Sequence, residues 1–110
     1  MIKVKQPAKS QRIACAHFII DVYLDPYNKR VRVDDYRGNV PMIIEKAEEQ
    51  ASLNQAEKLI IIGRQEDFPV FLEYGYQCEA MVDRFFHGSD GYYFTKYFVE
   101  DRKQSHQWLM

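Results

Sequence analysis

The sequence predicts an α/β protein in which a mixed sheet of five strands carries two helices. Three patterns indicate this class: strand-like stretches at both ends, an amphipathic helical stretch between them, and a run of branched aliphatic residues after that helix. A strand, a helix and a buried strand in succession form a βαβ unit with parallel strands and a right-handed crossover. The expected strands are residues 13–24, 29–36, 59–63, 76–86 and 92–98.

Size and composition restrict the class of protein further. At 110 residues the chain is long enough for one domain with a single core. A net charge of −1 argues against nucleic acid or an anionic membrane as the main partner. The sequence shows no signal peptide and no apolar stretch of membrane-spanning length, so the cytoplasm is the expected compartment. Cys15 and Cys78 lack metal-binding spacing and are expected to be small buried hydrophobic residues.

The first strands are expected to form a hairpin behind a loose arm of residues 1–12. Apolar residues recur at every second position of residues 13–24, as in a strand with one buried face. The stretch Asp25-Pro26-Tyr27-Asn28 is a turn in which Asp caps, Pro presets φ and Asn adopts the left-handed exit. Pairing Leu24 with Lys29 would place Val22 opposite Val31; a three-residue loop with a bulge would shift this register by one.

A helix is expected after this hairpin, and a buried strand after the helix. Asn39 is the predicted N-cap, and Pro41 suits the first turn. Leu59-Ile60-Ile61-Ile62-Gly63 has no polar face and indicates a buried strand. The predicted buried stripe of the helix is Val40, Ile43, Ile44, Ala47 and Ala51.

A short helix and a long hairpin are expected to complete the domain. Asp67 is the predicted N-cap, and Phe68, Phe71 and Leu72 share one face of this helix. Gly75 ends it in the left-handed conformation. The turn residues from His87 to Gly91 join the last two strands. Residues 99–110 are expected to be a polar tail or a linker to a downstream catalytic domain.

No catalytic set can be assembled from the sequence. His17, His87 and His106 fall in a strand, a loop and the tail, and the chain has no nucleophile elbow. The candidate cofactor-binding residues are Gly38 and Asn39, because a strand–Gly–helix junction offers backbone N–H groups and a helix dipole to a phosphate. Turn chemistry alone also explains this glycine. We expect no metal site.

Several short motifs carry a family resemblance that covers roughly residues 20–105. The N-terminal motifs are Asp25-Pro26-Tyr27-Asn28-Lys29-Arg30 and Asp35-Tyr36-Arg37-Gly38; the later ones are Phe71-Leu72-Glu73-Tyr74-Gly75-Tyr76, Glu79-Ala80-Met81, Phe86-His87-Gly88-Ser89-Asp90-Gly91 and Phe94-Thr95-Lys96. The later motifs resemble the closing half of a GNAT-type acetyltransferase. The combined pattern resembles the N-terminal region of the β-lysine N-acetyltransferases, which implies the sheet order first, second, third, fifth, fourth.

The resemblance implies a longer parent enzyme that transfers an acetyl group from acetyl-CoA to the ε-amine of β-lysine. In that family a degenerate N-terminal half precedes a complete GNAT domain. The family's cofactor loop reads Arg/Gln-x-x-Gly-x-Gly/Ala, but alignment on Gly38 puts Asp35 first and Val40 last. The short arm before Ile13 also lacks room for the usual first strand and two substrate-side helices. We therefore expect no cofactor, and no catalysis, in this fragment alone.

Three functional hypotheses follow. The first is a non-catalytic N-terminal module that supports the downstream catalytic GNAT domain of a β-lysine N-acetyltransferase. The second is a free-standing interaction or dimerisation module, in which a sheet edge pairs with a second copy. The third is a minimal acetyltransferase that binds CoA at residues 38–40. The candidate residues for contacting the substrate or the downstream domain are Tyr27, Arg30, Arg32 and Tyr36.

Overall fold

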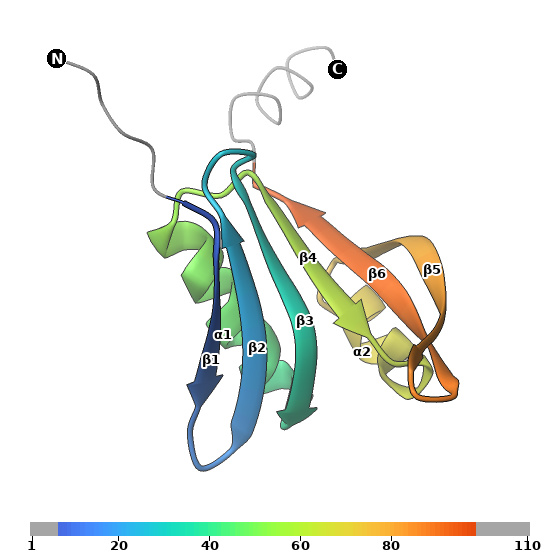
Figure 1. The fold of residues 1–110 in the computed structure, drawn as a ribbon. Helices are drawn as coiled ribbons and strands as arrows, with labels where there is room; N and C mark the ends of the chain where they lie inside the picture. The colour runs from blue at the N-terminus through green and yellow to red at the C-terminus, as the bar shows by residue number, and fades with distance from the viewer. Residues whose placement is uncertain (1–6, 99–110) are drawn as a thin grey trace, which may run out of the picture.

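The computed structural model describes residues 7–98 and confirms the α/β class, with six strands in place of five (Figure 1). The strand order is β1-β2-β3-β4-β6-β5, so the predicted order is also confirmed, with one strand added at the edge. Both α-helices cover the same face of the sheet, and we call the opposite face the open face. The elements are β1 Lys9–Ala14, β2 Phe18–Asp25, β3 Arg30–Gly38, α1 Val40–Leu53, β4 Lys58–Gly63, a short 3₁₀ turn Gln65–Asp67, α2 Phe68–Glu73, β5 Gln77–Phe86 and β6 Ser89–Tyr97.

The added strand β1 corrects the expectation of a loose arm up to residue 12 and of one strand over residues 13–24. The chain turns back after Ala14, where the N–H of Cys15 donates to the carbonyl of Phe18 at 2.9 Å. Strand β1 pairs antiparallel with β2, from Lys9 opposite Leu24 to Ala14 opposite Ile19. The sequence of β1 shows no clear strand pattern. A strand at the edge of the sheet buries few side chains, and this one carries the polar residues Lys, Ser, Gln and Arg. Cys15 itself is exposed, as is Cys78, so the expectation of buried thiols was wrong.

The β2–β3 hairpin has the predicted faces in a different register. Val22 lies opposite Val33 and Leu24 opposite Val31, two residues away from the predicted pairing. A shift of two keeps every side chain on its face, so the hydrophobic pattern does not distinguish the two registers. The ladder then shifts by one more residue, because Asp34 is an extra residue between the pairs Val22–Val33 and Asp21–Asp35.

The turn of this hairpin is capped as predicted. The carboxylate of Asp25 accepts hydrogen bonds from the backbone N–H of Asn28 at 3.2 Å and from its side-chain amide at 2.9 Å. The side-chain bond lowers the pKa of Asp25 below its usual value. The left-handed exit falls on Lys29, with φ of 55°, and not on Asn28 as expected. The turn is therefore displaced by one residue, to residues 26–29 inside the pair Asp25–Arg30, which accounts for the register difference.

Helix α1 forms a right-handed βαβ unit between the parallel strands β3 and β4. Asn39 is its N-cap, as predicted, and its side chain accepts from the N–H of Met42 at 3.0 Å. Ile43, Ile44, Ala47 and Ala51 are buried against the sheet, whereas Val40 is half-buried. No helix within residues 7–98 combines the length and apolar character needed to cross a membrane.

Helix α2 packs on the same core through Phe71. The ring of Phe71 stacks on Phe94 with centroids 4.4 Å apart and meets Tyr36 edge-on at 6.1 Å. Leu72, predicted to share the buried face, is 51% exposed because a helix of six residues presents little more than one residue to the sheet. Gly75 takes the expected left-handed conformation, with φ of 89°.

A glycine at the end of β3 is required by the close approach of β2. Gly38 has φ of 116°, and a Cβ there would lie 2.3 Å from the carbonyl oxygen of His17.

We predict that Gly38→Ala lowers the free energy of unfolding by at least about 3 kcal/mol, because backbone strain and a backbone clash add together. Gly88→Ala is the matched control: φ is also positive, at 102°, but no atom lies within 4 Å. It should cost about 1 kcal/mol. Equal losses in urea denaturation would contradict this explanation.

Candidate functional site

The candidate site lies where the parallel strands β3 and β4 separate. They pair only from Arg30 to Val33 on β3 and from Lys58 to Ile61 on β4, and then diverge (Figure 1). Beyond Val33, the edge of β3 that faces β4 has no strand partner among the described residues. Such an opening at the carboxyl ends of parallel strands is a common place for ligands.

One side chain, Arg64, lies in this opening. It follows β4 directly, and its guanidinium donates to the carbonyl of Tyr36 at 2.7 Å and to the carboxylate of Asp35 at 3.0 Å. The guanidinium carbon also lies 4.7 Å from the ring centre of Tyr36 and 4.4 Å from that of Phe86. Only 24% of the side chain is exposed. Arg64 therefore replaces the missing backbone partner of β3 and is held between two aromatic rings.

Tyr36 completes this network from the core side. Its hydroxyl donates to Asp67 at 2.5 Å and accepts from the N–H of Arg64 at 3.0 Å. Burial, reinforced by the bond to Asp67, raises the pKa of the Tyr36 phenol well above its ordinary value. Asp67 thus bonds to Tyr36 and makes no side-chain cap to α2, although it stands at the predicted N-cap position.

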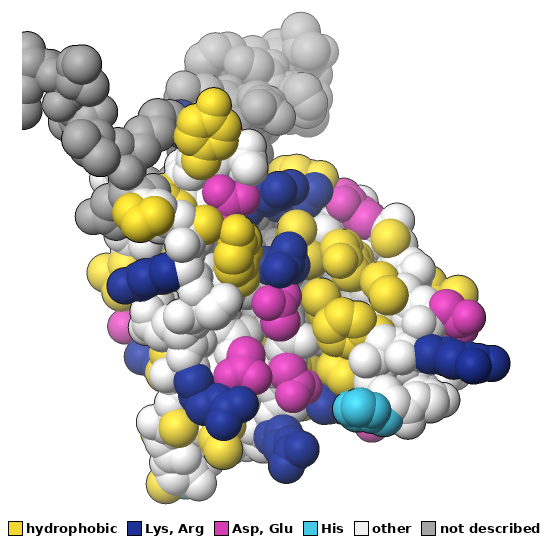
Figure 2. All heavy atoms as spheres, viewed as in Figure 1, with side chains coloured by type: hydrophobic (Ala, Val, Ile, Leu, Met, Phe, Trp, Pro, Cys, Tyr) yellow, Lys and Arg dark blue, Asp and Glu magenta, His cyan; other side chains and the backbone are white. Residues whose placement is uncertain are grey.

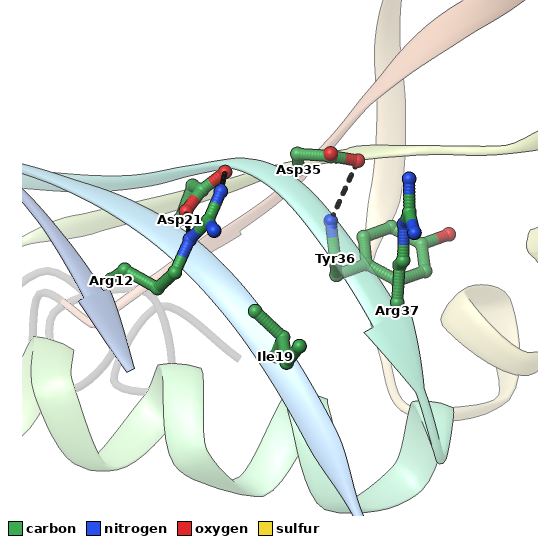
Figure 3. A pocket seen from close by; sticks show the side chains of 6 residues that line it. All are labelled: Arg12, Ile19, Asp21, Asp35, Tyr36 and Arg37. Atoms are coloured by element: carbon green, nitrogen blue, oxygen red, sulfur yellow. Dashed lines mark hydrogen bonds and ion pairs between the residues drawn. The ribbon is translucent and has the colours of Figure 1, made fainter. Parts of the chain in front are cut away.

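Two hollows adjoin this network on the open face. The larger, of about 450 Å³, lies between the end of β3, the residues after β4 and the β5–β6 turn. The smaller, of about 170 Å³, lies over β1–β3; in it Arg12 pairs with Asp21, and Asp35 accepts from the backbone N–H of Tyr36 (Figure 3). Figure 2 shows acidic side chains near the middle of the open face with basic ones around them. Asp35 and Arg37 line both hollows.

Hydrogen bonds within the chain occupy most of the candidate phosphate-binding junction at Gly38 and Asn39. The N–H of Asn39 donates to the carbonyl of His17 at 3.0 Å, that of Met42 to the Asn39 side chain at 3.0 Å, and that of Ile43 to the Asn39 carbonyl at 2.9 Å. Pro41 has no N–H to offer. Of the usual donors only Val40 remains, so the residues at this junction do not fit the pyrophosphate of acetyl-CoA.

The structure does not bring the four predicted contact residues together. Arg30 and Arg32 line one hollow of about 250 Å³ on the open face, whereas Tyr27 lies in the β2–β3 turn and is 70% exposed. Arg30 pairs with Asp25, and Arg32 with Asp34. Tyr36 is buried on the opposite face of β3, so its ring belongs to the core.

Sequence reasoning missed Arg64, the central residue of the site. Its one signal was its place directly after the apolar run of β4, at the carboxyl end of a parallel strand. Of the histidines, His17 is exposed and His87 lines the larger hollow, while His106 lies outside the described residues. Residues 7–98 contain no group of side chains suited to a metal ion.

A second polar network closes the space between α1 and the hairpin strands. The carboxylate of Glu48 accepts from the hydroxyl of Tyr76 at 2.7 Å and from the ammonium of Lys96 at 3.0 Å. Lys96 also donates to the carbonyl of Tyr74 at 3.1 Å. Burial raises the pKa of the Tyr76 phenol strongly. This network ties α1, the end of α2 and β6 together on the covered face.

The architecture is shared with solved acetyltransferases. It matches an acetyltransferase from Bacillus cereus with a TM-score of 0.63 and 14% identity, over 86% of this chain and 77% of that one. It matches nourseothricin acetyltransferase with a TM-score of 0.56 and 15% identity, over 74% and 57% of the two chains. At these identities the similarity establishes the fold alone: an α/β fold like that of these acetyltransferases.

One curated protein is similar in sequence. N-acetyltransferase YodP of Bacillus subtilis is 27% identical over 81 residues, which are 74% of this chain and 30% of YodP. The chain thus spans less than a third of the length of this relative. No family model matches the sequence.

The Arg64 network should contribute measurably to stability. We predict that Arg64→Ala lowers the free energy of unfolding by about 1–3 kcal/mol. The Tyr36 carbonyl and the Asp35 carboxylate would lose their hydrogen-bond donor, and the cation–π contacts with the rings of Tyr36 and Phe86 would also be lost. Arg37→Ala is the control: Arg37 is exposed and makes no hydrogen bond or ion pair within residues 7–98. It should change stability by less than about 0.5 kcal/mol in urea denaturation. Equal losses of unfolding free energy in the two variants would show that the contacts of Arg64 do not stabilise the fold.

The two buried phenols predict a loss of stability at alkaline pH. The folded-state pKa values of Tyr36 and Tyr76 are raised, so their contribution is complete below the ordinary tyrosine pKa of 10.0. Above that pH the unfolded chain releases these protons and the folded chain keeps them, so stability falls by about 1.4 kcal/mol per pH unit for each phenol. Urea titrations at rising pH should show this slope. Tyr36→Phe should reduce it; an unchanged slope would contradict the assignment.

Proposed function

We propose that this chain is the N-terminal, non-catalytic module of an acetyl-CoA-dependent β-lysine N-acetyltransferase of the cytoplasm. Its fold is that of acetyltransferases, and its sequence similarity is to an N-acetyltransferase of much greater length. β-Lysine as the acceptor, and hence a role in making a compatible solute, rest on the resemblance of the motifs Asp25–Arg30 and Asp35–Gly38 to that family.

The observation that supports a non-catalytic role most directly is the state of the β3–α1 junction. A pyrophosphate needs several free N–H groups at a helix N-terminus. Here two of those groups, the N–H groups of Asn39 and Met42, are bound within the chain, and a further position is proline. In the neighbouring opening between β3 and β4, Arg64 donates to the carbonyl of Tyr36 and to the carboxylate of Asp35. Acetyl transfer is therefore assigned to a downstream GNAT domain of the parent protein.

The role proposed for this module is to support that downstream domain. Arg30 and Arg32, side by side in one hollow, and Tyr27, in the exposed turn, are the candidate contacts with the downstream domain or its substrate. Tyr36 would act indirectly, because its ring is buried and its hydroxyl holds Asp67 and Arg64.

A second candidate function is a free-standing interaction or dimerisation module. The supporting observation is β5, an edge strand whose side chains are almost all exposed, with Met81 57% exposed. A second copy could cover this edge. Light scattering after size exclusion would separate the two proposals, because a stable dimer of the short chain supports the second.

Calorimetric titration of acetyl-CoA tests the main proposal. The 110-residue chain should give no saturable heat, whereas the longer protein that contains the downstream domain should bind in the micromolar range. An inactive variant of that domain's cofactor loop serves as the control in the longer protein. Saturable binding of acetyl-CoA to the short chain would overturn the proposal and favour a minimal acetyltransferase with its cofactor at residues 38–40.

A further inference from the structure

The larger hollow of the open face has the features of a small-molecule site. Its volume of about 450 Å³ lies within the range of pockets that bind metabolites. Three separate segments form it: the end of β3, the turn after β4, and the β5–β6 turn. The lining residues are Asp34, Asp35, Arg37, Arg64, Glu66, Phe85, Phe86, His87 and Ser89.

Most of the charges in this hollow are already paired. Asp34 forms an ion pair with Arg32, and Asp35 forms one with Arg64. Two charged residues remain: Arg37 and Glu66 form no hydrogen bond or ion pair with any residue of the described part of the chain. Both are exposed. The hollow therefore offers one unpaired cation and one unpaired anion.

This charge pattern selects against most classes of ligand. Three carboxylates against two guanidinium groups repel a phosphate or another multiply charged anion. A polycation is also disfavoured, because the hollow offers only one unpaired carboxylate and the unpaired guanidinium of Arg37 repels positive charge. A ligand with one charge of each sign satisfies both groups. Phe85, which is 38% exposed and meets Phe86 edge-on at 4.8 Å, adds an apolar wall for an aliphatic stem.

We propose that this hollow binds a small zwitterion of the amino acid class. Arg37 binds the ligand's carboxylate through its planar guanidinium, and Glu66 binds the ammonium group. The aliphatic part of the ligand lies against Phe85. The proposal goes beyond the role as a support module and does not depend on acetyl-CoA, since the helix start at Asn39 takes no part in it. Because both charged side chains are exposed, affinity is weak and decreases with salt.

Titration of the intact chain followed by backbone NMR tests this proposal. L-Norleucine has adjacent charges and a long stem, whereas γ-aminobutyrate has separated charges, so the two probes cover both spacings. We expect saturable shifts at Arg37, Glu66 and Phe85 with at least one probe, at a dissociation constant of roughly 1 mM. Blocking either charge, as in N-acetylnorleucine or norleucinamide, should abolish these shifts; the same holds for the amide and the N-acetyl form of γ-aminobutyrate.

Variants complete the test. Arg37→Ala and Glu66→Gln should each weaken binding about tenfold, the effect of losing one charge-assisted contact. Lys9→Ala and Glu73→Gln remove charges that do not line the hollow and should leave binding unchanged. Thermal unfolding checks that each variant is folded. No saturable shift with either probe, or binding insensitive to both Arg37 and Glu66, overturns the proposal. Acetyl-CoA is titrated separately, so failure of the module hypothesis is recognised independently.

Discussion

The bond network of Arg64 is the interaction on which the arrangement of this sheet depends. Parallel strands that separate leave backbone groups without partners, and unpaired polar groups are costly once they are removed from water. Arg64 meets this need with donors to Tyr36 and Asp35, and the rings of Tyr36 and Phe86 hold its guanidinium in place. One cation thus joins β3, the end of β4 and the end of β5 at the point where regular pairing stops.

The extra residue in β3 determines what the open face presents. Because Asp34 is inserted between two regular pairs, Asp35 comes to lie opposite Asp21, while Tyr36 turns into the core. Without the bulge, the alternation of the strand would send Tyr36 to the open face and Asp35 inward. The bulge therefore separates the charged side chains of the two hollows from the aromatic core that supports them.

Sequence patterns predicted which residues face the core and could not predict which residues pair. The alternation of β2 and β3 determines the faces, but a slip of two residues preserves that alternation. The register therefore depended on the position of the turn, which lies one residue later in the chain than predicted. Strand β1 escaped prediction because its polar residues bury little at an edge. The start of helix α1 was predictable from Asn39 and Pro41, and four of the five residues of its predicted buried stripe are buried.

The site was harder to predict because its key contacts are distant in sequence. Arg64 and Tyr36 lie 28 residues apart, and only the crossover of the βαβ unit brings them together. Gly38 and Asn39 were only candidates for a ligand-binding junction, and turn chemistry was the alternative. The structure gives a structural reason for both residues: the backbone of β2 approaches Gly38, and Asn39 caps its own helix.

The self-capped start of α1 has a thermodynamic consequence. In some helices the first N–H groups gain hydrogen-bond partners only when an anion binds. The stability of such a protein rises with the concentration of that ligand. In this chain the Asn39 side chain and the carbonyl of His17 satisfy two of those groups from within, the N–H groups of Met42 and Asn39. The start of α1 is therefore held by hydrogen bonds within the chain and needs no bound anion to complete it.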